Sequence, residues 1–440
     1  MGNGCLLTEC CSGICRMITR KVANRDNRTA ALRIMLCAVL VLAGQFFPRA
    51  KGADDATAAA RAGLERLQTL RKERPGDGIL VFYEALLRTR MGEREPVLAL
   101  LRSLKGRKLG LIPTRESGFE ALWNEEEFQA LSKELSEEEP ATPVSSVAFR
   151  LKDPRLIPEG IAYDAVGQRF FLGSVAQHKV IVTDGKGETH DFSKAGDQLD
   201  AVLGLSVDSV HGLLYAVSTN SFEESGKKQR RNMVVRYDLK TDRLTDRFAA
   251  SDAAQLNDLT VAPDGTLYAT DSEAGALFRK KPDEAKLLPF GEKGKLPGAN
   301  GITLSPDGTL YVTLSTGIAR VDTKTGEPVR LPQPDTVATG GCDGLYWHEG
   351  DLLGIQNTTN PGRVIRMALS DKGTRISDVT VLQSHQHPEF DEPTTGAIAH
   401  GALNVIANSY VGHYQPDGSI KNVEDLKGTT VIAVPLRRAQ

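Results

Sequence analysis

The chain has 440 residues, of which 40% are hydrophobic and 25% charged, as is usual for a soluble globular protein. Its formal net charge is −2, so neither nucleic acid nor an anionic membrane surface is an expected partner. Five of the six cysteines lie within the first 37 residues, and Cys342 alone lies in the part expected to fold, which excludes an internal disulfide there.

The N-terminal segment has the layout of a secretory signal peptide. Residues 34–47 form an apolar run after several arginines and lysines, and Ala50-Lys51-Gly52 is a small-x-small cleavage site. An uncleaved membrane anchor at 34–47 is the alternative, although a span usually needs about 20 residues. We therefore expect residues 1–52 to be a signal peptide with an over-long extension, and the mature protein to be secreted or periplasmic.

Residues 53–139 are expected to form a small α-helical domain. Leucines 64, 67 and 70 lie on one helical face, and three further periodic runs follow. The density of Ala and Leu resembles degenerate tetratricopeptide hairpins, which would make this domain a site for a protein partner. A helical cap packed on the next domain is the alternative. Two prolines in the following stretch indicate a linker at 140–146.

From residue 147 to 437 the sequence repeats. Asn257, Asn300 and Asp343 stand 43 residues apart, and each opens a segment that reads strand, tight turn with glycine, strand. Six copies begin at Glu159, Leu203, Asn257, Asn300, Asp343 and Thr395. Hairpins repeated every 40 to 50 residues are typical of propeller blades. The predicted fold class is mainly β, a six-bladed β-propeller behind the helical domain.

A strand at each end of the repeat region lacks a local partner. Residues 147–151 precede the first copy, and residues 429–436 follow the last one. A ring of blades must cover its open edges, so we expect these two strands to pair and complete the last blade.

The residue that opens each copy is expected to face the mouth of the central channel, because the innermost strands line that channel. We call these six residues the mouth ring. Four of them carry side-chain amide or carboxylate oxygens: Glu159, Asn257, Asn300 and Asp343. Such donors suit a hard divalent cation. Asn or Asp before Gly is also ordinary turn chemistry, but Glu159 has no such preference.

Four motifs in order, "PEGIAYD", "LNDLTVAPDGTLYATDS", "ANGITLSPDGTLYVT" and "CDGLYW", resemble the SMP-30, gluconolactonase and luciferin-regenerating-enzyme family. The resemblance implies that Glu159, Asn300 and Asp343 hold a divalent metal, most often Ca²⁺, with Mg²⁺, Mn²⁺ or Zn²⁺ as alternatives. It also implies that Asn257 is a fourth ligand or a substrate contact and that Asp343 is the general base. The implied reaction is metal-dependent hydrolysis of a lactone or related ester.

One position departs from the family pattern. Members that act on sugar lactones commonly carry Arg two residues before the first Asn, where this chain has Gln255. A non-catalytic recognition propeller with a structural metal, working with the helical domain in protein contacts, is therefore the alternative function. His178 is a candidate second base or substrate contact at the mouth. His385 and His387, two residues apart, are a conceivable roof over the mouth or a transition-metal pair.

Overall fold

The computed structural model describes residues 53–139, 141–142, 145–223, 229–357 and 362–436. The expected signal peptide and the alternative anchor at 34–47 lie outside these residues. Within them, no helix is both long and apolar enough to cross a membrane.

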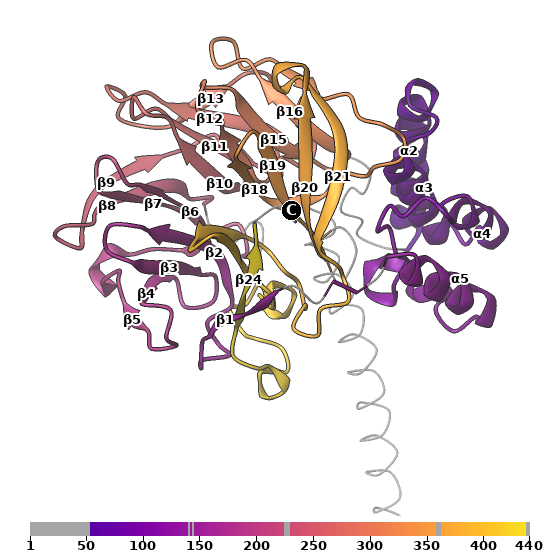
Figure 1. Ribbon diagram of the computed structural model, residues 1–440, viewed down its shortest axis with the longest axis horizontal. Coiled ribbons are helices and arrows are strands. Elements are labelled where there is room, and N and C mark those ends of the chain that lie inside the picture. Colours follow the sequence, from indigo (N-terminus) through magenta and orange to yellow (C-terminus); the bar gives the residue numbers. More distant parts are fainter. Residues whose placement is uncertain (1–52, 140, 143–144, 224–228, 358–361, 437–440) are drawn as a thin grey trace, which may run out of the picture.

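Six four-stranded antiparallel sheets surround a common axis, so the chain forms the predicted six-bladed propeller (Figure 1). In each sheet the first strand of the repeat lies next to the channel. Blade 1 contains β2 (Pro158–Asp164), β3 (Arg169–Ser174), β4 (Lys179–Thr183) and β5 (His190–Asp191). Blade 2 contains β6 (Ala201–Asp208), β7 (Leu213–Thr219), β8 (Asn232–Asp238) and β9 (Arg243–Ala249). Blade 3 contains β10 (Leu256–Val261), β11 (Leu267–Asp271), β12 (Ala276–Lys280) and β13 (Leu288–Phe290).

Blades 4 to 6 follow the same order, except that the last blade takes its outer strand from the start of the domain. Blade 4 contains β14 (Ile302–Leu304), β15 (Leu310–Leu314), β16 (Gly317–Val321) and β17 (Pro328–Arg330). Blade 5 contains β18 (Cys342–His348), β19 (Asp351–Gln356), β20 (Arg363–Ser370) and β21 (Arg375–Gln383). Blade 6 contains β22 (Gly396–Ala399), β23 (Ala402–Ile406), β24 (Thr430–Pro435) and β1 (Ser146–Arg150).

Local sequence explains the hairpins, and packing between blades explains the ring. Gly265, Gly308 and Gly350 take φ values of 83°, 81° and 90° in the first turns of blades 3, 4 and 5, a region that glycine enters without steric cost. Apolar side chains of adjacent blades then interdigitate, as Leu277 of blade 3 and Val312 of blade 4 do in one buried cluster. Each blade therefore needs a neighbour on both sides to bury its faces.

The ring closes as predicted, by pairing of β1 with β24. Ser146 lies opposite Ala433 and Arg150 opposite Thr430, in an antiparallel register with one irregularity between them. Phe149 anchors the strand: it is 5% exposed, and its ring centroid lies 5.1 Å from that of Phe170 in blade 1. The first strand therefore completes blade 6 and also packs on the blade that follows it.

Replacing this anchor tests the closure. Phe149→Ala is expected to lower the free energy of unfolding by about 3 kcal/mol, because a buried aromatic side chain is lost and a cavity remains. Chemical denaturation measures the loss. Val147→Ala is the matched control, because Val147 lies on the same strand and is 43% exposed; equal effects of the two changes would contradict the anchoring role.

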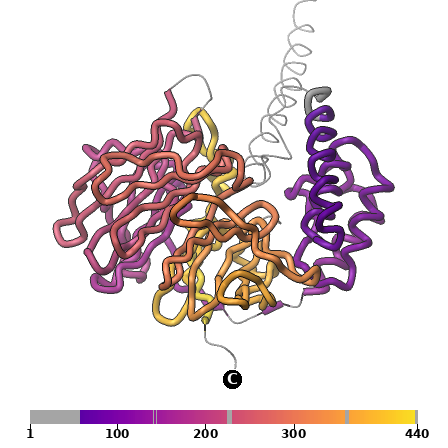
Figure 2. The backbone as a smooth tube through the Cα atoms, turned by 90° about the horizontal axis from the view of Figure 1, so that it is seen from above, coloured from indigo at the N-terminus to yellow at the C-terminus, as the bar shows by residue number. Residues whose placement is uncertain are grey.

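The helical region forms its own apolar core beside the propeller (Figure 2). Phe119 packs between Phe82 and Phe128, with ring centroids 5.5 Å from each. Asp77 caps the second helix by accepting a hydrogen bond from the backbone N–H of Ile79. The helices are α2 (Ala53–Glu73), α3 (Gly78–Arg90), α4 (Arg94–Arg102) and α5 (Glu126–Glu137), with short turns at Arg115–Phe119 and Glu120–Leu122. Four more short turns lie in the propeller, at Ala195–Asp197, Asp371–Gly373, Val411–His413 and Val423–Asp425.

The helical domain docks on blades 4 and 5, where specific polar contacts join the two parts (Figure 1). The Tyr83 hydroxyl donates to the Ser315 carbonyl at 3.0 Å, and Arg330 Nη2 lies 3.1 Å from the Asp77 carboxylate. Both contacts involve residues that are buried or half-buried. The joint is therefore a packed interface.

Glu139, which the sequence placed next to a solvent-exposed linker, forms a buried ion pair in the structure. Glu139 is 5% exposed; its carboxylate pairs with Arg363 of blade 5 and lies 3.1 Å from His385 Nδ1. Burial alone would raise the pKa of Glu139, but the contacts with His385 and Arg363 outweigh it and hold that pKa below its usual range. Glu139 therefore fastens the helical domain to the propeller.

Glu139→Gln is expected to destabilise the protein by about 3 kcal/mol at pH 7, because Arg363 would be left buried without its counter-charge. The folded-state pKa of Glu139 is depressed, so its contribution is present above the unfolded value of about 4.3 and is lost as pH falls through the folded value. The difference between wild type and variant should shrink in acid. Calorimetry over a pH series measures it, with Glu137→Gln as the exposed control.

Candidate metal centre at the mouth of the propeller

The structure brings the six mouth-ring residues together at one end of the channel. Glu159 lies in β2, Asn257 in β10 and Asp343 in β18, while Asn300 and Thr395 come just before β14 and β22. Five of the six are 5–6% exposed, and Leu203 is 1% exposed. A cavity of about 260 Å³ runs along the inner strands and is lined by Thr395 of the mouth ring and by Asp258, whereas the four oxygen donors of the ring are not among its lining residues.

Asp343 is held by two amide groups. Asn300 Nδ2 donates to Asp343 Oδ1, and Asn357 Nδ2 donates to Asp343 Oδ2 at 2.7 Å. Because the Asn300 amide nitrogen is used in this way, its oxygen Oδ1 is the free end, and it is buried without a hydrogen-bond partner among the described residues. The hydrogen bonds thus fix the carboxylate and leave an amide oxygen available.

Glu159 is fixed through its backbone and free at its side chain. Its carbonyl accepts hydrogen bonds from the hydroxyls of Thr394 and Thr395, at 2.9 and 2.5 Å. The carboxylate oxygen Oε2 is buried, and no described group donates to it. A buried carboxylate oxygen without a donor is costly unless a cation or a solvent molecule meets it.

Burial raises the pKa of all three acidic groups at the mouth, and neighbouring carboxylates raise those of Glu159 and Asp258 further. Burial, followed by the charges of Asp343 and Asp258, raises the pKa of Glu159 well above its usual range. Burial raises the pKa of Asp343 to about 6, although Asn357 and Asn300 oppose the rise, and it raises the pKa of Asp258 to about 7. Buried carboxyl groups are costly to ionise, and they repel one another when ionised. A bound cation would offset both effects.

The donor set therefore fits a hard divalent cation. Glu159 Oε2 and Asn300 Oδ1 are unpartnered oxygens in the described part of the chain, and the Asp343 carboxylate lies against the same amide. Across the described ranges, no three His, Cys, Asp or Glu side chains form a metal-binding group. The mouth ring supplies two carboxylates and completes its set with amides, which suits Ca²⁺ or Mg²⁺ better than Zn²⁺.

Glu159→Gln tests this fit without an activity assay. The change keeps the shape and replaces one of three buried carboxyl groups with a neutral amide, so the chelator-treated variant is expected to melt about 2 °C above chelator-treated wild type. The rise in melting temperature that Ca²⁺ gives the wild type should largely disappear in the variant. Differential scanning fluorimetry measures both shifts. An undiminished Ca²⁺-dependent rise would remove Glu159 from the site.

Asn257 is oriented by a residue that the sequence reasoning missed. Its Nδ2 donates to Ser272 Oγ at 2.9 Å, and Ser272 in turn donates to the Ala299 carbonyl at 2.6 Å. The signal was present in the sequence, because a buried serine stands fifteen residues after the leading residue in each of the first four blades. These serines are Ser174, Ser218, Ser272 and Ser315. In blade 5, Asn357 stands fourteen residues after Asp343 and directly follows the second strand, as Ser272 and Ser315 do in blades 3 and 4.

The structure gives each of the three candidate histidines its own partners. His178 lies in the turn between β3 and β4 with a φ of 53°, and its Nε2 is 3.2 Å from the Tyr414 hydroxyl. His385 bonds Ser136 and Glu139 of the helical domain, whereas His387 Nδ1 accepts from the backbone N–H of Glu389. The metal-pair hypothesis for His385 and His387 is therefore wrong, because the two rings bind different partners.

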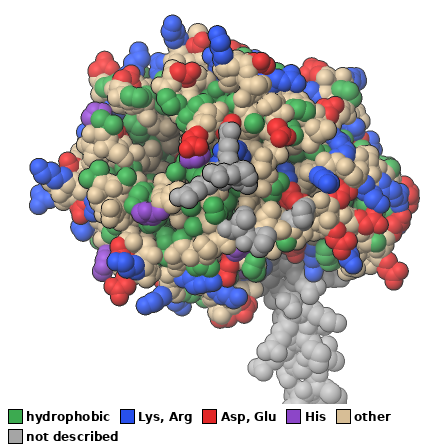
Figure 3. Space-filling view, in the orientation of Figure 1, with side chains coloured by type: hydrophobic (Ala, Val, Ile, Leu, Met, Phe, Trp, Pro, Cys, Tyr) green, Lys and Arg blue, Asp and Glu red, His purple; other side chains and the backbone are tan. Residues whose placement is uncertain are grey.

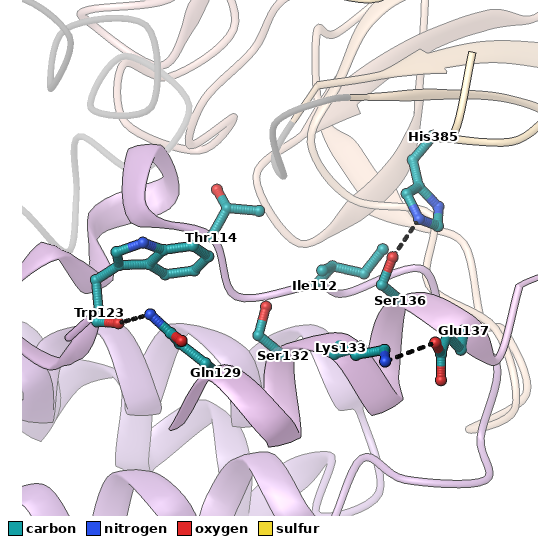
Figure 4. Close-up of a pocket in the computed structure, with 9 residues that line it drawn as sticks. All are labelled: Ile112, Thr114, Trp123, Gln129, Ser132, Lys133, Ser136, Glu137 and His385. Atoms are coloured by element: carbon teal, nitrogen blue, oxygen red, sulfur yellow. Dashed lines mark hydrogen bonds and ion pairs between the residues drawn. The ribbon is translucent and has the colours of Figure 1, made fainter. Parts of the chain in front are cut away.

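A second cavity, of about 500 Å³, lies at the joint between the helical domain and the propeller (Figure 4). Trp123, Gln129 and Ser136 line it from the helical side, and His385 lines it from the propeller. The mouth-ring residues are not among those that line it. On the face drawn in Figure 3, acidic and basic side chains are interspersed over the described surface, in keeping with the small net charge.

Comparisons with known proteins give loose likenesses. No family model matches the chain, and no curated protein matches its sequence. An aldose sugar dehydrogenase from Streptomyces coelicolor is 14% identical, with 67% of this chain and 99% of that chain covered and a TM-score of 0.45. A gluconolactonase from Xanthomonas campestris is 16% identical, with 68% and 99% covered and a TM-score of 0.43. A nidogen/laminin complex is 15% identical, with 52% and 86% covered and a TM-score of 0.40. Identities and scores this low carry no argument about activity.

Proposed function

We propose that the protein is a metal-dependent hydrolase that opens a lactone or a related ester at the mouth of the propeller. The observation that carries the proposal is the pair of unpartnered oxygens, Glu159 Oε2 and Asn300 Oδ1, beside the amide-held carboxylate of Asp343. Buried acids that repel one another when ionised destabilise the fold, so a channel with a purely structural role would gain nothing from them. We also propose that the protein acts outside the cytoplasm, in accord with the leader-like sequence of residues 1–52.

The residues of the mouth site would serve as cation ligands, substrate contact and general base. Glu159, Asn300 and Asp343 would hold the cation, with Asn257 as a fourth ligand or as a contact to the substrate. When bound, the cation would polarise the lactone carbonyl and stabilise the negative charge that develops on it. Asp343 is the general base that takes a proton from the attacking water. The amides of Asn300 and Asn357 keep its carboxylate in one orientation.

The substrate class is constrained by Gln255 and by the site's surroundings. Gln255 is 8% exposed, and the residue offers no cation for the hydroxyl groups of a sugar lactone. Leu203 is the apolar member of the mouth ring and belongs to a cluster that contains Tyr410 and Tyr414. These features favour a lactone or ester that is less polar than a sugar lactone.

The experiment is a pH-stat assay of the purified protein on sugar, aliphatic and aromatic lactones, with Ca²⁺, with other divalent ions and with chelator. Acid release should require a divalent ion and should fall by at least about 100-fold in Asp343→Asn, since a general base typically contributes 10²–10⁴-fold. Asp307→Asn is the matched control, because Asp307 is an exposed aspartate in a hairpin turn of blade 4.

No turnover on any lactone, by a protein shown to be folded and to bind the ion, would overturn the hydrolase proposal. The alternative, a recognition propeller with a structural metal that acts with the helical domain in protein contacts, would then be favoured. A melting curve of the chelator-treated protein, recorded beside the assay, separates a metal that serves the reaction from one that only stabilises the fold, because only loss of the former stops acid release while the protein stays folded.

A further inference from the structure

Asn357 is placed to control the geometry of Asp343. Its Nδ2 donates to Asp343 Oδ2 at 2.7 Å and to the Pro393 carbonyl at 3.1 Å, and its backbone N–H donates to the Gly341 carbonyl at 3.2 Å. Its amide oxygen Oδ1 is buried and has no partner among the described residues. Asn357 therefore bridges the first strand of blade 5 and the segment that leads into blade 6.

The residue before Asn357 ties this position to the helical domain. Gln356 Nε2 donates to the Gly340 and Ala338 carbonyls at 2.8 and 3.1 Å, and Gln356 Oε1 accepts from Arg363 Nε at 2.8 Å. Because the Gln356 side chain is satisfied at both ends, its position is fixed. The backbone that carries Asn357 is thereby fixed as well.

Arg363 uses the rest of its guanidinium on the helical domain. It is 4% exposed; Nη2 donates to the Leu109 carbonyl at 2.6 Å, and Nη1 pairs with the Glu139 carboxylate. Gly110 packs directly on this guanidinium, where a Cβ atom would lie 2.4 Å from it. One arginine thus connects the docked helical domain to the end of β19.

We propose that Asn357 is a positioning residue of the mouth site, and that the helical domain, once docked through Arg363, holds Asn357 against Asp343. The inference rests on the proposed cation site, and it assigns the helical domain a part in that site. Hydrogen-bond partners of metal ligands orient those ligands, and their loss typically weakens metal binding by 10- to 100-fold. The same logic applies to a general base, whose rate depends on its orientation.

The first test is Asn357→Ala, followed by calorimetric titration with Ca²⁺. The Kd for Ca²⁺ is expected to rise by about 10- to 100-fold, and a cooperative melt in chelator shows that the variant is folded. In the lactone assay, kcat should fall with KM unchanged, because the substrate contacts are kept. A Kd within twofold of wild type would overturn the proposal.

The second test compares two interdomain arginines. Arg363→Ala and Arg330→Ala each remove contacts to the helical domain, but only Arg363 bonds Gln356 beside Asn357. Both variants should lower the melting temperature, and only Arg363→Ala should weaken Ca²⁺ binding, by about 10-fold. Equal Ca²⁺ affinities in the two variants would overturn the role of the helical domain. If wild type bound no divalent cation, the proposed function itself would fail, and the two failures are therefore distinct.

Discussion

The structure depends on packing of each blade against both of its neighbours. A single hairpin sheet cannot bury its two faces, so the six repeats are stable only as a closed ring. The pairing of β1 with β24 closes that ring and places an early strand of the chain in its last blade. Closure also fixes the axis, and a fixed axis is what allows side chains from different blades to meet within hydrogen-bonding distance.

The mouth ring depends on the fixed axis that closure of the six blades provides. Glu159, Asn300 and Asp343 are far apart in sequence, and each lies at the start of the innermost strand of its own blade: Glu159 and Asp343 at irregular points of their ladders, and Asn300 just before β14. The carboxyl groups of Glu159 and Asp343 are brought together although their charges repel one another, at a cost that the fold must offset elsewhere. Sites at which local rules are broken in this way are commonly functional ones.

Periodicity made the propeller predictable. Turn glycines and alternating apolar residues recur in every copy, so blade number, strand closure and the positions of the mouth ring followed from the sequence. The partners of the ring did not follow, because they depend on contacts between elements. Asn357 interrupts the series of serines at the ends of the second strands, and its bond to Asp343 crosses to the first strand of the same blade. Glu139 looked like part of an acidic, solvated stretch, since no local pattern shows that Arg363 lies against it. Docking between domains leaves no periodic signal.

The path of the chain between the two domains has a kinetic consequence. Thr142 and Ser145 run along the end of blade 5, bonded to Ser384 and Gln383, before the chain enters blade 6 as β1. The helical domain therefore packs on blade 5, while β1, the strand that follows it in the chain, completes blade 6. Peeling β1 from the ring requires that these bonds and the domain interface break as well, and barriers of this kind govern unfolding rates more than equilibrium stability. Such a linkage makes the brief openings at which proteases act rarer.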